Sequence, residues 1–125
     1  MRRFTRWMPV LFLVFAAALL LAAPASAAIK STVTITSGEG TEFTGKVTSP
    51  KAKCRAGRTV KLFREDDSGE ESTLEGTART NKSGAWAMEG SFIAGVFYAR
   101  VLPAIFHVNG MTIRCAGDVS LRQHF

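Results

Sequence analysis

The sequence has only two cysteines and two histidines among its 125 residues. A closed zinc site needs four ligands of such types, and His107 and His124 show no recognised ligand spacing from each other. No Gly-x-Ser-x-Gly motif is present, and no motif places a base beside a nucleophile. These absences argue against catalysis, so we expect a protein that is not an enzyme and has no catalytic residue, metal or cofactor.

Acidic residues are absent from the first 38 positions. This part begins with basic residues, continues as an almost wholly apolar run and ends in small residues at an A-x-A site. These are the three parts of a secretory signal peptide. We therefore predict a helical signal peptide over residues 1–27 that directs ordinary Sec export. The prediction rests on Arg2, Arg3 and Arg6 at the start and on Ala25, Ala27 and Ala28 around the cleavage site.

Two other interpretations of this segment stay open. The apolar run of about 17 residues is at the lower limit for crossing a bilayer, so an uncleaved anchor is the competing interpretation. The pair Arg2-Arg3 is an incomplete twin-arginine motif. No cysteine stands at the cleavage point, which argues against lipid attachment there. After cleavage we expect a protein without a stable membrane span, secreted or held in the cell envelope or periplasm.

Cysteine is scarce, yet Cys54 and Cys115 both lie in the part that would be exported. In an oxidising compartment we expect them to form a disulfide. About 98 residues remain after cleavage, enough for one domain of marginal stability. A disulfide closing so long a loop contributes roughly 4 kcal/mol in the chain-entropy estimate. Two free thiols or a metal-binding pair is the alternative.

The chain has little net charge once the signal is removed. Three of the sixteen basic residues lie in the signal, so thirteen basic and ten acidic residues remain, a net charge of +3. This balance requires neither a nucleic-acid nor a membrane partner. A basic group around the first cysteine is a candidate contact for an anionic cell-wall polymer or lipopolysaccharide, although it also serves solubility. No aromatic residue is interleaved with it, as a nucleic-acid surface would require. The group consists of Lys51, Lys53, Arg55 and Arg58.

Helical periodicity is absent from the exported part. Polar and apolar residues instead alternate with a period of two in short segments between turns, which is typical of half-buried strands. About seven such strands predict an all-β, antiparallel, seven-stranded sandwich. We divide the chain into the signal peptide over 1–27, an N-terminal strand and glycine-rich hinge over 28–40, and a sandwich domain over 41–125. The strands are expected over residues 32–36, 42–48, 58–64, 73–80, 85–88, 95–101 and 119–121.

Three segments carry more specific expectations. In the strand over 73–80, Leu74, Gly76 and Ala78 are expected to face inward. The acidic stretch over 65–71 is expected to be a solvated hairpin tip, because it lacks the spacing of an EF-hand calcium loop. Residues 102–111 are expected to form an apolar loop or an irregular strand.

Several motifs resemble those of a known family. They are Phe43–Val47, Cys54-x-x-Gly57-Arg58, Thr80–Trp86 and Gly95–Val101, followed by Cys115. Together they resemble the transthyretin-like, or carboxypeptidase-regulatory-like, β-sandwich domains, and especially small exported bacterial proteins with a cysteine pair. The resemblance covers residues 41 to 122. It implies a prealbumin-like (Ig-like) sandwich of two sheets, used as a structural, carbohydrate-facing or protein-binding accessory.

Enzymes also occur on the transthyretin fold, but their activity is not implied for this chain. The hydroxyisourate hydrolases use histidines with an arginine and a C-terminal Tyr-Arg-Gly-Ser, whereas this chain ends in Arg122-Gln123-His124-Phe125. A shared fold does not transfer a function. An enzyme or metal-dependent protein on a transthyretin-like scaffold remains the alternative, with His107 as the first residue to suspect.

The leading expectation is an exported binding or structural accessory at the cell surface or outside the cell. Its partner would be a cell-envelope polymer or another exported protein. One route to a partner is β-augmentation by the edge strand over 32–36. Another is the apolar segment over 102–108, which either caps the open end of the sandwich or forms an exposed partner surface. The residues of that surface are Leu102, Ile105, Phe106 and His107.

Overall fold

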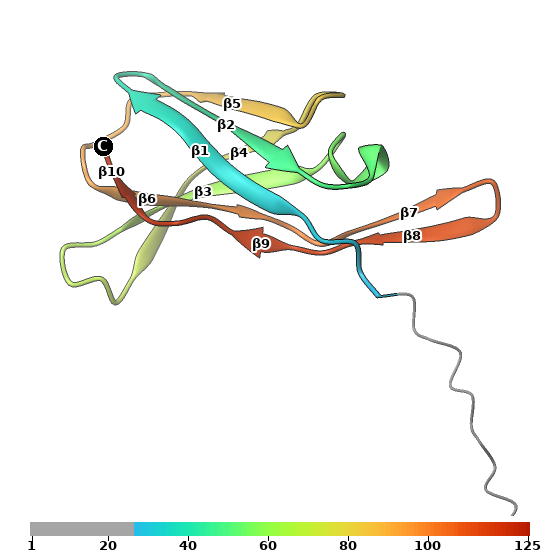
Figure 1. The fold of residues 1–125 in the computed structure, drawn as a ribbon. Helices are drawn as coiled ribbons and strands as arrows, with labels where there is room; N and C mark the ends of the chain where they lie inside the picture. Colours follow the sequence, from blue (N-terminus) through green and yellow to red (C-terminus); the bar gives the residue numbers. More distant parts are fainter. Residues whose placement is uncertain (1–26) are drawn as a thin grey trace, which may run out of the picture.

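The computed structural model describes residues 27–125, and residues 1–26 of the predicted signal peptide, with Arg2, Arg3, Arg6 and Ala25, lie outside the described residues. The described chain is all-β apart from one 3-10 helix, η1, over Ala52–Cys54 (Figure 1). No helix in this part of the chain is long and apolar enough to cross a membrane. The strands are β1 (Thr32–Glu39), β2 (Glu42–Thr48), β3 (Thr59–Glu65), β4 (Ser72–Arg79), β5 (Ala85–Glu89), β6 (Val96–Val101), β7 (Ala104–Val108), β8 (Met111–Cys115), β9 (Asp118–Val119) and β10 (Gln123–His124).

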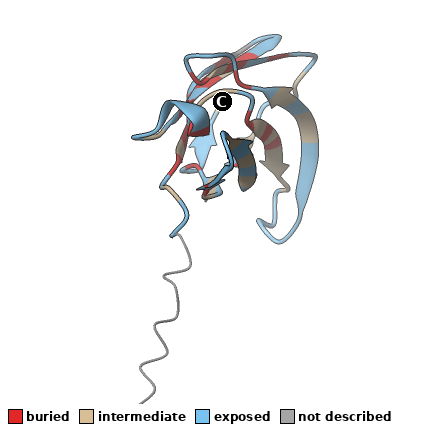
Figure 2. Cartoon of the chain, turned by 90° about the vertical axis from the view of Figure 1, so that its right-hand side faces the viewer, coloured by how far each residue is buried: buried red, intermediate tan, exposed pale blue. Residues whose placement is uncertain are grey.

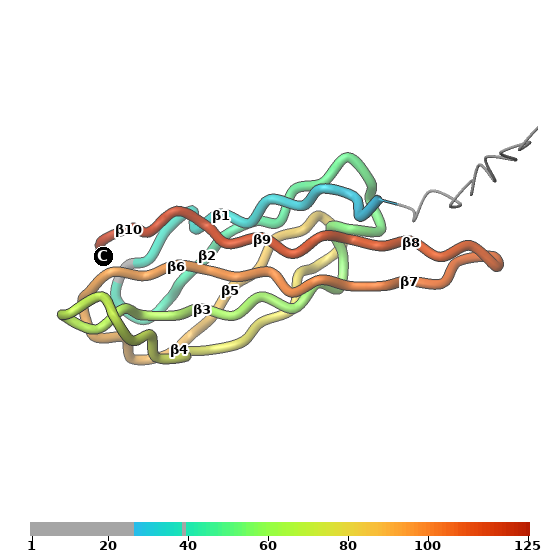
Figure 3. Tube along the Cα trace, turned by 90° about the horizontal axis from the view of Figure 1, so that it is seen from below, coloured from blue at the N-terminus to red at the C-terminus, as the bar shows by residue number. Residues whose placement is uncertain are grey.

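The named strands pair antiparallel throughout, as predicted. One sheet has the order β1-β2-β5, and a second has the order β10-β6-β3-β4, with β9 also paired to β6. The two sheets face each other across the buried core. The β7–β8 hairpin forms a third, two-stranded sheet that extends beyond them (Figures 1 and 3).

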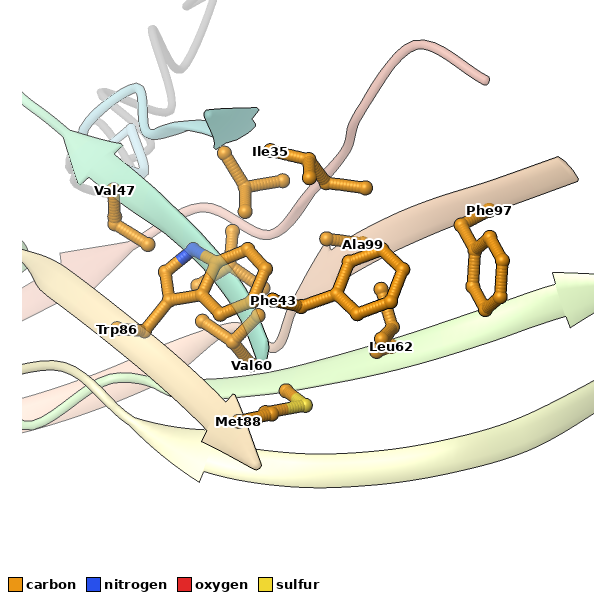
Figure 4. Packing of buried hydrophobic residues seen from close by; sticks show 11 residues of the cluster. Ile35, Phe43, Val47, Val60, Leu62, Trp86, Met88, Phe97 and Ala99 are labelled. Carbon is orange, nitrogen blue, oxygen red and sulfur yellow. The ribbon is translucent and has the colours of Figure 1, made fainter. Parts of the chain in front are cut away.

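The core lies between the two sheets because their strands alternate inward apolar and outward polar residues. In β2, for example, Phe43 and Val47 are buried while Lys46 is exposed. Gly45 lies where a Cβ atom would overlap the Trp86 ring, so only glycine lets β2 and β5 pack this closely. Figure 4 shows how the core side chains interlock. The buried cluster comprises Val33, Ile35, Phe43, Val47, Val60, Leu62, Trp86, Met88, Phe97, Ala99 and Val101.

Strand β1 belongs to this same core. The sequence predicts an N-terminal strand and glycine-rich hinge over 28–40, and in the structure Val33 and Ile35 of this segment pack with core residues of 41–125. β1 also pairs with β2 along its length. Gly38 lies against Phe43, where a Cβ atom would overlap the phenyl ring. Residues 28–40 and 41–125 therefore share one core.

Strand β4 departs from the predicted facing. The pairing of β3 with β4 is irregular after Leu62, so that Leu62 lies opposite Gly76 but Phe63 lies opposite Leu74. Such a bulge changes which face a side chain occupies, and Leu74 is 49 % exposed. The expectation that Leu74 faces inward is wrong, whereas Ala78 packs against the core as expected.

Two further segments differ from the expectation. Most of 102–111, expected as a loop or irregular strand, belongs to the β7–β8 hairpin. Its turn residues Asn109 and Gly110 have φ angles of 50° and 74°, as a type I′ turn requires. The expected strand over 119–121 is replaced by the two-residue strands β9 and β10, and Leu121 between them is 85 % exposed. The chain thus has more than the seven strands predicted.

The predicted disulfide is confirmed. Cys54 at the end of η1 and Cys115 at the end of β8 are bonded, with Cα atoms 5.5 Å apart, and both are buried. The bond fastens the hairpin to the loop after β2 across 61 positions of sequence. A buried disulfide fits an oxidising, extracellular type of compartment.

We expect the double substitution Cys54→Ser and Cys115→Ser to lower the free energy of unfolding by about 2–5 kcal/mol, because the unfolded chain regains the freedom of a long loop. Urea unfolding followed by fluorescence measures the change, since Trp86 is buried in the core. Reduced wild-type protein should match the double variant. An oxidised wild type no more stable than this variant would contradict the prediction.

Candidate functional site

Arg58 is fully buried at the end of the molecule where the hairpin begins. Its Nη1 donates to Ser31 Oγ and to the Cys54 carbonyl, each at 2.8 Å. Its Nη2 donates to the carbonyls of Leu102 and Ala116, also at 2.8 Å. The predicted contact of Arg58 with a polyanion is therefore wrong, because the guanidinium is enclosed and its terminal nitrogens are already bonded.

The charge of Arg58 is stabilised by neutral acceptors. Neither of the two ion pairs found in the described chain involves it, and burial lowers its pKa. A guanidinium stays protonated at neutral pH even so, because its ordinary pKa is far above 7. The four acceptors belong to the start of β1, the η1 loop, the end of β6 and the segment after β8. Arg58 therefore ties these four segments together at one point.

Lys51, Lys53 and Arg55, three of the four basic residues predicted to contact a polyanion, remain at the surface. Other basic residues that are distant in sequence lie at the same end of the molecule. The Thr80 hydroxyl donates to the Arg55 carbonyl at 2.6 Å, which holds the turn after β4 against the η1 loop. The Ser49 hydroxyl donates to the Lys30 carbonyl at 2.8 Å, which holds the N-terminal segment beside the end of β2. We call this surface the basic end (Figure 1). It presents Lys30, Lys46, Lys51, Lys53, Arg55, Arg79 and Lys82.

A shallow groove on the outer face of the β1-β2-β5 sheet adjoins the basic end. Lys46 and Arg79 contribute its cationic side chains, and the rest of its lining is uncharged, including Thr44 and Ala87. Figure 2 looks onto this end of the molecule, where the residues around η1 are exposed. A groove with neutral walls and two cations suits an extended chain that carries negative groups.

Acidic residues gather at the opposite end, at which the β1–β2 turn, the β3–β4 turn and the end of β5 all lie (Figure 1). Both ion pairs of the described chain lie here: Arg64 with Glu75, at 2.8 Å, and Arg122 with Glu65. The cations at this end are thus neutralised, whereas those of the basic end have no ion pair among the described residues. We call this surface the acidic end, and it presents Glu42, Glu65, Asp66, Asp67, Glu70, Glu71, Glu75 and Glu89.

The β3–β4 turn is an exposed tip, as expected for the acidic stretch. The Ser68 hydroxyl donates to the Asp66 carboxylate at 2.8 Å, and this hydrogen bond lowers the pKa of Asp66. Backbone N–H groups of the turn, including that of Gly69, lower it further. Donors that favour the ionised carboxylate keep this turn negative at neutral pH.

The predicted apolar surface lies at the hairpin, and its residues do not all face the same way. Leu102 is partly buried at the base, where its carbonyl accepts from Arg58. Phe106 packs against the small cluster around the disulfide. Ile105 and His107 are exposed on the other face, and His107 Nδ1 lies 3.3 Å from a threonine hydroxyl of β8. The segment extends outward and does not cap the open end of the two facing sheets (Figure 3).

The edge of β1, the candidate for β-augmentation, is partly occupied. β1 is an edge strand of its sheet, as expected. The backbone N–H of Val33 donates to the Asp118 carboxylate at 2.9 Å, and the side chain of Val33 is buried. Pairing with a partner strand would have to displace this bond.

The two histidines do not form a site. His107 lies on the hairpin, whereas His124 lies in β10 at the opposite end of the molecule (Figure 1). In the part of the chain that the structure describes, no group of three His, Cys, Asp or Glu residues is placed to hold a metal ion. No protein-family model matches this chain, and no curated protein does either.

We expect Arg58→Lys to lower the free energy of unfolding by about 3 kcal/mol or more, because one ammonium cannot satisfy four acceptors on four segments. The matched control is Arg55→Lys, three positions earlier and partly exposed, which should change stability little. Thermal unfolding of both variants measures the difference. Equal stability of the two variants would contradict the structural role assigned to Arg58.

Proposed function

We propose that the chain is an exported, non-enzymatic binding accessory that attaches through its basic end to an anionic polymer of the cell envelope. The observation that supports this function best is the separation of charge. Seven cations, none with an ion pair in the described chain, gather at one end, and the acidic turns gather at the other. A field arranged in this way attracts and orients a charged partner.

We also propose that the fold is a prealbumin-like (Ig-like) sandwich of the transthyretin-like kind. Two facing antiparallel sheets support this assignment, as do the motifs around Cys54 and Trp86. We further propose that a Sec signal peptide ending at Ala27 is removed. The disulfide supports such a location outside the reducing cytoplasm.

The residue types at the basic end favour a polymer over a single small anion. Lysine carries a compact, strongly hydrated charge on a flexible stem, which adapts to negative groups at variable spacing. Exposed Lys51, Lys53 and Lys82 sit on two adjacent loops and can contact successive groups of one polymer. Screening limits such attraction to about 8 Å at physiological salt, so the binding is salt-dependent. The acidic end is repelled by the same polymer, which favours end-on attachment.

We expect Lys51→Glu/Lys53→Glu to weaken binding to long-chain polyphosphate by at least about tenfold in 0.15 M salt, because two contacts become repulsive. Fluorescence anisotropy with labelled polymer, repeated with lipopolysaccharide, measures the affinity. The slope of binding against salt concentration should also become shallower.

The matched control is Lys61→Glu/Arg100→Glu, which changes the net charge equally on the outer face of the second sheet. This variant should retain most of the binding. If both double variants lose binding equally, net charge alone is responsible and the basic end has no special role. If the wild type binds neither polymer in 0.15 M salt, the proposed function fails.

A further inference from the structure

The tip of the β7–β8 hairpin is an exposed, narrow and apolar projection. The type I′ turn at Asn109-Gly110 joins the strands with two residues and sets Val108 directly opposite Met111. Met111 is 64 % exposed. The hairpin contains Arg114 and no acidic residue. A two-stranded ribbon is only marginally stable alone, and here the disulfide fixes its base, so its tip is held out in one direction.

The opposite end of the molecule has an apolar hollow of about 140 Å³. It opens between the β1–β2 turn, the loop from β5 to β6 and the C-terminal segment. Phe43 forms edge-to-face contacts with Phe92 and Phe125, with ring centroids 4.7 and 5.3 Å apart. Ile93 at its rim is 70 % exposed. We call this hollow the mouth, and its phenyl rings are the surface on which a methionine thioether packs well.

An unfavourable pair of charges lies beside the mouth, where β2 begins and β5 ends. Glu42 of β2 lies directly opposite Glu89 of β5, and both are exposed. Like charges in directly opposed positions of a sheet destabilise it. Neither glutamate belongs to the ion pairs of the described chain. A cation supplied from outside would relieve this repulsion.

We propose that the hairpin tip of one copy docks into the mouth of a second copy. Met111 packs against Phe92, Phe125 and Ile93 of the receiving copy, and Arg114 of the hairpin approaches Glu42 and Glu89 beside the mouth. The partner is a second copy because the two surfaces match in both respects: the apolar tip fits the apolar hollow, and the Arg114 cation complements the paired glutamates beside it.

The geometry of this contact determines the kind of assembly. The tip and the mouth lie at opposite ends of the molecule, so one copy cannot fill its own mouth (Figure 3). The contact is therefore head-to-tail, and such contacts form open chains unless a rotation closes them. The lysines of the basic end take no part in the contact, so this inference is independent of polymer binding.

Sedimentation of the exported protein over a range of concentrations tests the inference. Wild type should grow beyond a dimer as concentration rises. Met111→Asp removes the tip and Ile93→Asp removes the mouth, so each variant alone should stay monomeric. An equimolar mixture of the two should form a dimer and nothing larger, because only one intact tip and one intact mouth remain.

Leu121→Asp is the matched control, since Leu121 is similarly exposed but belongs to neither surface. It should assemble like wild type. Glu42→Gln/Glu89→Gln should weaken assembly by at least about threefold while raising the unfolding temperature, because the repulsion disappears. A wild type that stays monomeric at millimolar concentration, a closed wild-type dimer, or a mixture that stays monomeric would each overturn the inference.

Discussion

The guanidinium of Arg58 is the interaction on which the arrangement of this molecule depends. A buried charge is costly unless its hydrogen bonds are satisfied, and here the acceptors come from four segments that are far apart in sequence. The segments must meet correctly before the charge is stabilised. One side chain thereby links the first strand, the η1 loop, the end of β6 and the far side of the hairpin. Because Cys54 supplies one acceptor, the disulfide and Arg58 stabilise the same junction.

Much of the fold follows from the sequence because its determinants are local. Alternation in β2 and β6 places Phe43, Val47, Phe97 and Val101 in the core, and the two cysteines pair as their compartment requires. Leu74 is different, since a bulge in β3–β4 pairing moves it to the outer face, and strand alternation carries no sign of where a bulge occurs.

The hairpin and the candidate surfaces were only partly predictable. Asn109-Gly110 between apolar segments is a strong hairpin signal, which predicts a strand on each side of the turn, as β7 and β8 are. In the sequence, Arg58 cannot be distinguished from the other cations of its basic loop. Its burial depends on segments that only the fold brings together. The separation of charge, in contrast, can be predicted from the sequence. Turns that alternate between acidic and basic along antiparallel strands place their charges at opposite ends.

The chemical nature of the acceptors around Arg58 determines how the junction tolerates substitutions. Three of the four are backbone carbonyls, which every amino acid provides. The residue types at 102 and 116 are therefore free to vary without loss of the bonds, provided that the chain path is kept. The hairpin between those positions needs to preserve Cys115 and its entry and exit directions. We therefore expect changes in length and sequence at the hairpin tip, beyond the cluster around the disulfide, to leave the hydrogen bonds of Arg58 and the two sheets intact.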